Sequence, residues 1–243
     1  MGHQALLLAV AGLAVFSGAV VQGSVGFGLG LVAAPLVTIL DPTLMPGSVT
    51  LVSVVFPVFT LVREWRGIDW RGLGWAQLGR VPGTVTGGFV AVYVNVAQLG
   101  FLVAAMVIAA VLVSVRSTAV PNNPGTLAGA GYLSGVVGTA TGIGGPPIAL
   151  VYQDATGPKI RATLAAFFFL SAAQSLVILA VLGRLPQRAL GFGAALIPFL
   201  LIGYAMSGPV RRYVDGGRVR RGVLVVAIVS AVALLVNSTL KVI

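Results

Sequence analysis

Two glycine-rich segments hold the residue types that could carry chemistry in this chain. Residues 17–30 read SGAVVQGSVGFGLG, and residues 134–146 read SGVVGTATGIGGP. Glycine accepts positive φ angles and allows close approach to the backbone, so each segment is expected to interrupt a helix. The helix that restarts after each interruption would present free N–H groups and the positive end of its dipole, which together bind anions.

The candidate binding residues lie in and around these two segments. Their backbone amides, hydroxyls and side-chain carboxamides are all neutral donors, which suits a small oxyanion that must also be released. Gln174 joins them because a carboxamide near the middle of an apolar segment needs polar partners. The predicted substrate-binding residues are Gln22, Gly23, Ser24, Gly26, Phe27, Gly28, Thr139, Thr141, Gly142, Ile143, Gly144, Gly145 and Gln174.

Close helix packing is the alternative explanation for glycine in a membrane helix, because small residues let two backbones touch. We assign that role to glycines outside the two G-x-G segments. This set comprises Gly18, Gly87, Gly88, Gly129, Gly135, Gly203 and Gly208. The matched positions of the two G-x-G segments themselves favour a binding site. A dinucleotide-binding motif is excluded, since no strand precedes the glycines and no acidic ribose partner follows them.

Little other chemistry is available to the chain. It has one His, five carboxylates and no Cys. We therefore expect no catalytic residues, no metal site and no cofactor, and the chain is not predicted to be an enzyme. Ser53, Ser171 and Ser175 are interpreted as hydrogen-bond partners between helices. Arg80 is interpreted as a solvated residue of an Arg-rich loop at 63–80, with a position facing a vestibule as the alternative.

The elements that must position these residues are membrane helices. Of the 243 residues, 58% are hydrophobic and only 8% are charged, and the net charge of +10 lies in short gaps between apolar runs. These values exclude a soluble domain and a disordered chain. They predict an all-α polytopic membrane protein whose partner is the lipid bilayer and not nucleic acid. The apolar segments are approximately 4–40, 47–62, 81–97, 98–115, 126–152, 162–182, 189–210 and 222–240.

The chain also contains an internal repeat. Residues 26–28 (Gly-Phe-Gly) align with residues 142–144 (Gly-Ile-Gly) at an offset of 116 residues, and the same offset places Gly87 on Gly203. A turn-rich stretch of Pro, Asn and Gly separates the two copies. The chain is therefore predicted to consist of two halves, residues 1–121 and residues 122–243.

Each glycine-rich segment could lie within a single membrane crossing or could turn back as a hairpin. Single crossings would divide the 15 basic residues 8 against 7, whereas hairpins at 4–40 and 126–152 leave only Arg184, Arg188 and Lys241 opposite the other 12. The positive-inside rule favours the hairpins, each followed by three transmembrane helices. The two halves are then inverted repeats, as in many transporters. Both termini are expected on the non-cytoplasmic side of the inner (plasma) membrane.

The two segments resemble a known family. The residues GSVGFGLG at 23–30, TGIGGPP at 141–147 and LSG at 133–135 are similar to those of the TauE/SafE sulfite-exporter family, and the resemblance covers nearly the whole chain. It implies a transporter of a small anion, such as sulfite, thiosulfate or a sulfonate. Leu29 stands where members often carry a further glycine, which leaves one segment bulkier. The resemblance does not name the substrate, the direction of transport or the coupling ion.

Three other function classes stay open at this point. An anion channel is a close variant of the transporter. A non-transporting membrane scaffold or accessory subunit would tolerate bulky replacements in the glycine-rich segments. An intramembrane enzyme is disfavoured, because no nucleophile–base pair or metal-ligand cluster occurs in the apolar segments. A second copy of the chain is a candidate partner in a homodimer.

Overall fold

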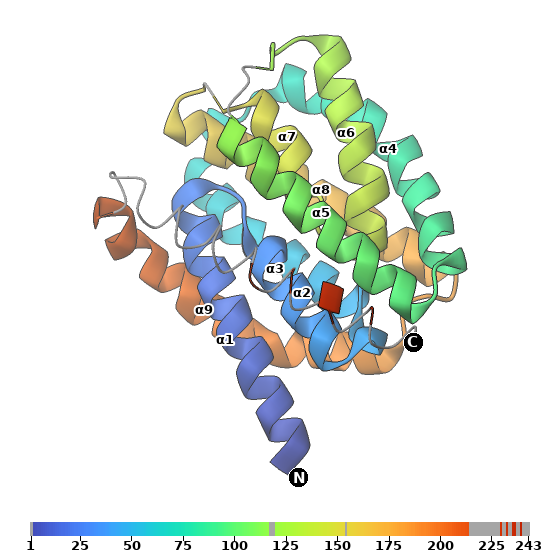
Figure 1. Ribbon diagram of the computed structural model, residues 1–243. Helices are drawn as coiled ribbons and strands as arrows, with labels where there is room; N and C mark the ends of the chain where they lie inside the picture. Colours follow the sequence, from blue (N-terminus) through green and yellow to red (C-terminus); the bar gives the residue numbers. More distant parts are fainter. Residues whose placement is uncertain are drawn as a thin grey trace.

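The computed structural model describes residues 2–116, 120–153 and 155–213, together with single positions at 229, 232, 235, 236 and 239. Throughout this part of the chain the elements are helices (Figure 1). They are α1 (Gly2–Val25), α2 (Leu29–Leu40), η1 (Pro42–Leu44), α3 (Gly47–Glu64), η2 (Trp65–Gly67), α4 (Trp70–Tyr93), α5 (Val96–Arg116), α6 (Pro124–Thr141), α7 (Gly145–Val151), α8 (Gly157–Val181) and α9 (Gln187–Tyr213). The predicted span 222–240, apart from those single positions, lies outside the described residues.

Several of these helices have the length and composition of membrane spans. In the described residues, four apolar segments are long enough to cross a bilayer: Gln4–Ser24, Gly47–Gly67, Gly157–Val181 and Gln187–Pro209. Two shorter apolar helical segments, Leu29–Leu40 and Gln98–Ala109, accompany them. The prediction of an all-α membrane protein is therefore confirmed at the level of its helices and their apolar character.

Helix α4 begins well before the predicted span 81–97. The side chain of Asp69 accepts a hydrogen bond from the Gly72 N–H at 3.0 Å, which caps the first turn of the helix. The helix then runs from Trp70 to Tyr93 with Pro82 inside it. The expectation of an Arg-rich loop over residues 63–80 is therefore wrong. The Asp69 cap starts a helix at Trp70, in the middle of the expected loop, and Arg80 lies within that helix.

Both glycine-rich segments interrupt a helix. Helix α1 ends at Val25, and Gly26 and Gly28 adopt φ angles of 100° and 133° before α2 begins. Helix α6 ends at Thr141, and Gly142 adopts a φ angle of 77° before α7 begins. These angles are in the region that only glycine enters at low cost, which explains why the helix stops at these residues.

The chain reverses direction at each interruption. A methyl group placed on Gly18 of α1 would lie 2.9 Å from Cα of Leu29, so the start of α2 lies against the body of α1. In the second segment the Ser134 hydroxyl of α6 donates a hydrogen bond to the carbonyl oxygen of Gly144. We call residues 26–28 the first break and residues 142–144 the second break. The helix after the second break starts at Gly145 and is only seven residues long.

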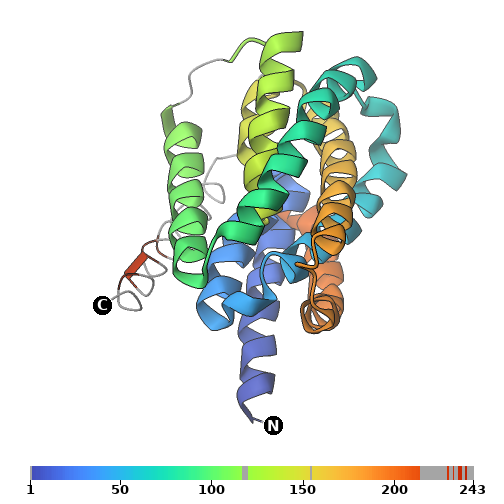
Figure 2. The same cartoon turned by 90° about the vertical axis from the view of Figure 1, so that its right-hand side faces the viewer.

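The helices of the first and second halves pack against each other. Helix α1 packs against α9, α6 packs against α4, and α3 packs against α8 (Figures 1 and 2). Each of the two helices that precede a break thus lies beside a helix from the other half. The buried apolar residues form two clusters, one around α1, α2, α3, α5 and α9, and one around α4, α6, α7 and α8.

Glycine makes these contacts close. A methyl group on Gly79 of α4 would overlap with the carbonyl oxygen of Ala128, and one on Gly131 of α6 would overlap with that of Ala76. Helices α4 and α6 therefore touch backbone to backbone, as small residues allow in membranes. The predicted packing role is confirmed for five glycines: Gly18, Gly87, Gly88, Gly135 and Gly203. It is wrong for Gly129 and Gly208, where a methyl group would meet nothing within 4 Å.

Candidate functional site

The two breaks lie against each other in the middle of the molecule. A methyl group on Gly30, in the first turn of α2, would lie 2.7 Å from the carbonyl oxygen of Gly142 in the second break. Ile143 of the second break is 2% exposed and belongs to the apolar cluster around α1 and α2. Phe27 of the first break packs against both apolar clusters. Segments more than 100 residues apart in the chain thus meet at one place.

A cavity of about 60 Å³ lies where the breaks meet. A cavity that holds one water molecule needs roughly 15 Å³ of such space, so this one has room for about four waters or one small ion. Helices α1, α2, α3, α4, α6, α7 and α8 all contribute to its wall. The residues that line it are Gln22, Phe27, Gly28, Gly30, Leu31, Thr50, Ser53, Arg80, Gly138, Gly142, Ile143, Gly144, Gly145, Pro146, Phe168, Ser171, Ala172 and Ser175.

Many of the predicted binding residues line this cavity. They are Gln22, Phe27, Gly28, Gly142, Ile143, Gly144 and Gly145. Gly23 and Gly26 instead line a small neighbouring pocket of about 10 Å³, which Gln22 and Arg161 also line. Gln22 therefore stands between the two spaces. Arg161 is held there by an ion pair with Glu64, with Nε 3.0 Å from Oε2.

Two of the predicted hydroxyl donors are used inside their own helices. The Ser24 hydroxyl donates to the Val20 carbonyl at 2.8 Å, and the Thr141 hydroxyl donates to the Val137 carbonyl at 2.8 Å. Thr141 Oγ1 also accepts a hydrogen bond from the Ile143 N–H at 3.2 Å. Neither residue lines the cavity, and Thr141 instead supports the turn of the second break.

The remaining two predicted residues also lie outside the cavity wall. Thr139 Oγ1 is 2.8 Å from the hydroxyl of Ser175, which does line the cavity. Gln174 does not line the cavity, because its Nε2 donates to Oε1 of Gln77 on α4 at 3.0 Å. The partner that a carboxamide needs at this depth is thus another carboxamide from a neighbouring helix.

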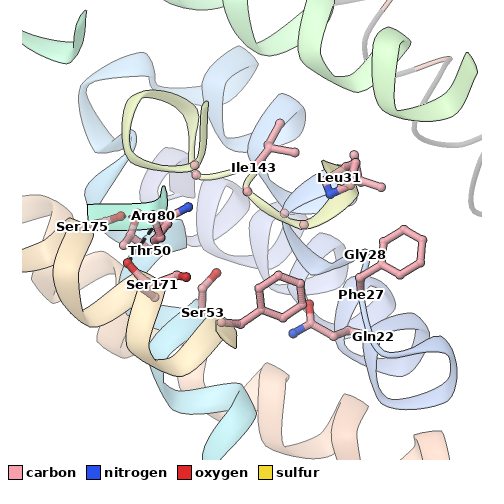
Figure 3. A pocket seen from close by; sticks show the side chains of 18 residues that line it. Gln22, Phe27, Gly28, Leu31, Thr50, Ser53, Arg80, Ile143, Ser171 and Ser175 are labelled. Atoms are coloured by element: carbon pink, nitrogen blue, oxygen red, sulfur yellow. Dashed lines mark hydrogen bonds between the residues drawn. The ribbon is translucent and has the colours of Figure 1, made fainter. Parts of the chain in front are cut away.

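Gln22 holds the first break in shape. Its Oε1 accepts a hydrogen bond from the Leu29 N–H at 3.1 Å, and its side chain is 8% exposed. The first N–H groups of a helix have no acceptor within the helix, so Gln22 satisfies one of them from seven residues away. The Nε2 group of the same side chain lies at the cavity, where it can donate hydrogen bonds (Figure 3).

The second break presents fewer backbone donors than expected. Helix α7 starts with Gly145 followed by two prolines, at 146 and 147, which carry no N–H. Gly142 already donates to the Gly138 carbonyl at 2.9 Å, and Ile143 donates to Thr141. The expected anion site at the start of this helix is therefore weak on its backbone alone.

Arg80 is the strongest donor in the cavity wall, although it is expected to be a solvated loop residue. That expectation is wrong: Arg80 is 2% exposed and lines the cavity. Its Nη1 donates to the carbonyl oxygen of Ser134 and, at 3.1 Å, to the Ser134 hydroxyl. Its Nη2 donates to the Ser171 carbonyl at 3.2 Å and to the Ser175 hydroxyl at 2.9 Å. Figure 3 shows Arg80 beside Ser171 and Ser175 at one side of the cavity.

All of these acceptors are neutral. In the part of the chain that the structure describes, the carboxylates that form ion pairs do so with other cations, and none pairs with Arg80. Asp41 pairs with Arg188 at 2.9 Å, Glu64 with Arg161 at 3.0 Å, and Asp69 with Lys159 at 3.3 Å. The guanidinium carbon of Arg80 also lies 5.9 Å from the centre of the Phe167 ring, a cation–π distance.

Two buried polar atoms at the cavity have no hydrogen-bond partner among the described residues. They are Nε of Arg80 and the hydroxyl oxygen of Ser171. Buried polar atoms are nearly always paired, so unpaired ones beside a cavity indicate a site for a polar guest. A guest that satisfies the guanidinium must accept hydrogen bonds, and an anion does so most strongly.

Several lining residues escaped the sequence reasoning. They are Gly30, Leu31, Thr50, Gly138, Pro146, Phe168 and Ala172, together with Ser53, Ser171 and Ser175, which are expected only as interhelical partners, and Arg80, for which a vestibule is only the alternative. A signal for Arg80 exists in the sequence: Gly79, Gly83 and Gly87 recur every four residues. That spacing places one small-residue stripe along a helix through Arg80, and Asp69 marks the start of that helix.

Comparison with known proteins identifies a family for this chain. No curated protein and no solved structure matches the chain. The profile of the family described as sulfite exporter TauE/SafE matches residues 10–234, which include both breaks and the whole of the cavity wall. Because the match covers most of its length, the chain belongs to the sulfite exporter TauE/SafE family.

Proposed function

We propose that this chain is a transporter of a small sulfur anion, bound in the cavity between the two breaks. One observation carries the proposal: the cavity joins both breaks and contains a buried guanidinium that no described carboxylate neutralises. A buried cation is costly unless a counter-charge accompanies it. The printed description of the family as a sulfite exporter supports a sulfur oxyanion, or a related organosulfonate, as that counter-charge.

The composition of the cavity wall supports an anion and not a cation. The lining contains a guanidinium, a carboxamide and hydroxyl groups, and it contains no carboxylate. Thr50 and Ser53 already donate to backbone carbonyls of α3 or its N-terminal flank, at 2.8 Å each, so the side-chain donors left over are those of Arg80, Gln22 and Ser171. Few donors around a single charge give binding that is reversible, as transport requires.

The repeat supports movement of the two halves, 1–121 and 122–243, about this site as inverted repeats. The offset of 116 residues relates α1 to α6 and α4 to α9, and the structure pairs α1 with α9 and α6 with α4. The two pairings are therefore equivalent under the repeat. In transporters of this type, one repeat rocks against the other and exposes a central site to each side in turn.

The same reasoning gives the orientation that we propose for the inner membrane. With hairpins at both breaks, the basic residues other than Arg184, Arg188 and Lys241 belong to the cytoplasmic side, and both termini lie on the opposite side. Arg80 counts toward that total by sequence, but it is buried in α4. Arg80 is therefore left out of the charge count, and the proposed orientation in the membrane rests on the remaining basic residues.

Flux measurements on purified protein test the proposal. We expect proteoliposomes that contain the chain to take up sulfite with saturable kinetics, and we expect Gly144→Leu to abolish uptake because its side chain would fill the cavity. A linear, unsaturated conductance would identify an anion channel instead. Equal flux in the wild type, in Gly144→Leu and in empty liposomes would identify a non-transporting scaffold and would overturn the proposal.

The substrate class is tested separately, by the thermal stability of the purified protein. A ligand that binds only the folded state raises the unfolding temperature, and the rise grows with the logarithm of the ratio of its concentration to its Kd. We expect sulfite, thiosulfate or a small sulfonate to raise it more than sulfate, acetate or chloride at equal ionic strength. An equal rise with every anion would contradict a specific sulfur-anion site.

A further inference from the structure

We infer that Arg80 supplies the fixed positive charge that selects an anion in the cavity, with the second break shaped to hold its guanidinium there. This inference rests on the proposed function and deepens it by assigning the charge of the site to one residue. It replaces the expectation that neutral donors alone form the site, because the cavity wall contains a full charge.

The guanidinium is held in place by backbone and hydroxyl groups that leave its charge uncompensated. Ser134 of α6 and Ser171 and Ser175 of α8 accept its hydrogen bonds, and all three side chains are at most 4% exposed. These acceptors fix the position of the two terminal nitrogens. The Nε–H is left without a partner, and an oxyanion in the cavity is the group that would satisfy it.

The glycines of the second hairpin make room for this side chain. A methyl group on Gly138 would lie 2.8 Å from Nη1 of Arg80, and one on Gly144 would lie 3.0 Å from the same atom. Gly144 has a φ angle of −98°, which other residues adopt without strain, so its backbone conformation does not require glycine. The absence of a side chain at this position is therefore explained by the guanidinium.

The charge is present in only one of the two halves. The offset of 116 residues places Leu196 of α9 at the position of Arg80, and Leu196 is fully buried in the apolar cluster of the first break. A residue needed only to join helices would suit both positions equally. The presence of a cation only where the cavity lies favours a role toward the ligand.

The alternative is that Arg80 only ties α4 to α6 and α8. Under that alternative, Arg80→Gln lowers the unfolding temperature of the ligand-free protein and leaves the rise caused by sulfite unchanged. Under our inference, Arg80→Gln removes an uncompensated buried charge, so it abolishes the rise caused by sulfite while the ligand-free protein stays folded. The two roles therefore predict opposite responses of the same two measurements.

The experiment compares wild type, Arg80→Gln, Arg80→Lys and Arg188→Gln. Arg188 is a matched control, because its side chain is 66% exposed, it pairs with Asp41, and it does not line the cavity. Unfolding temperature is measured with sodium sulfite and with sodium chloride at equal ionic strength, and sulfite flux is measured in proteoliposomes. We expect Arg188→Gln to behave as wild type, and Arg80→Gln to lose both the sulfite-induced rise and the flux.

Arg80→Lys provides a second test that does not depend on the folding of Arg80→Gln. Lysine keeps the charge but lacks the planar fork of donors, so we expect KM for sulfite to rise by about tenfold with a smaller change in the maximal rate. An unchanged KM in Arg80→Lys, or a full sulfite response in Arg80→Gln, overturns the role inferred for Arg80 but leaves the proposed transport function standing. A wild-type chain with neither sulfite-induced rise nor flux overturns the proposed function, and this inference with it.

Discussion

Both breaks begin with a glycine of positive φ, but they differ in their polar support and at their third residue, where φ is 133° in the first break and −98° in the second. In the first break, Gln22 of the preceding helix accepts the N–H of Leu29. In the second break, the position equivalent to Gln22 is Gly138, and the space above it is filled by the guanidinium of Arg80 from another helix. The comparison teaches that two breaks can both reverse the chain while the side chains around them differ, so that the charge lies beside only one of them.

The helix pairs that support the two breaks differ in how closely their backbones approach each other. Where α1 meets α9, the closest neighbours of Gly12 and Gly23 are side chains, and a methyl group on Gly203 would lie 2.5 Å from the carbonyl oxygen of Phe16. Where α6 meets α4, methyl groups on Gly79 and Gly131 would lie closer still to backbone carbonyl oxygens and would overlap with them. The closer backbone contact occurs beside the second break, and it brings Arg80 of α4 within reach of Ser134 on α6.

The largest effect is expected from filling this backbone contact. Gly131→Ala would force the methyl group onto the carbonyl oxygen of Ala76 and should destabilise the fold by about 3 kcal/mol, as overpacking does at its upper range. Gly129→Ala on the same helix meets nothing within 4 Å and should change stability by less than about 1 kcal/mol. The check is the unfolding temperature of the two purified variants, and equal temperatures would mean that α4 and α6 are not in backbone contact.

The next largest effect separates the two breaks directly. Gly144→Ala places a methyl group 3.0 Å from Nη1 of Arg80, so it should raise KM for sulfite by about tenfold, equivalent to about 1.4 kcal/mol. Gly26→Ala meets no atom closer than 3.5 Å but has a φ of 100°, so it should cost about 1–2 kcal/mol of stability through backbone strain. Paired kinetic and unfolding measurements test this division, which a larger KM change in Gly26→Ala would reverse.

A smaller effect concerns the polar support of the first break. Gln22→Leu removes the acceptor of the Leu29 N–H and should lower stability by about 1 kcal/mol, the usual loss when a helix N-cap is removed. Gln22→Glu keeps an acceptor but adds a negative charge to the wall of the same cavity, so it should weaken sulfite binding more than Gln22→Leu does. Titration of both variants with sulfite gives the order of affinities, and tighter binding by Gln22→Glu would count against an anion site.

The smallest effect concerns the start of α4, the helix that carries Arg80. Burial alone raises the pKa of Asp69, but hydrogen bonds from the Gly72 N–H and Tyr152, together with Lys159, outweigh it and hold the pKa below its usual 3.8. The stability from this group is therefore present above pH 3.8 and is lost as the pH falls below that value. We expect the unfolding temperature to drop less between pH 5 and pH 3 in Asp69→Asn than in wild type. A parallel drop in both would show that Asp69 contributes no such stability.

The positions of both breaks could be predicted because they depend on local properties. Gly26, Gly28 and Gly142 have positive φ angles, and glycine adopts that conformation at low cost because it has no Cβ atom. The apolar segments likewise predict most helices, because the hydropathy of a segment depends only on its own consecutive residues. The start of α4 was missed because low hydropathy over residues 70–80 outweighed the Asp69 cap.

The binding residues were predicted only in part, because lining a cavity is not a local property. Ser24 and Thr141 have the hydroxyl groups that an anion site needs, but each bonds to a carbonyl of its own helix. Ser171 and Ser175 have the same chemistry and do line the cavity, because α8 turns that face toward Arg80. The residue type alone does not distinguish these two pairs.

The sequence by itself therefore determined the membrane class, the positions of the two breaks and the family to which the chain belongs. Only the tertiary structure decided where the charge of the site lies. Arg80 is buried by partners that are 54, 91 and 95 residues away along the chain, on α6 and α8. Its change from an apparent loop residue to the cation of a cavity depends on how those helices pack, because burial and neutral partners are properties of the assembled fold.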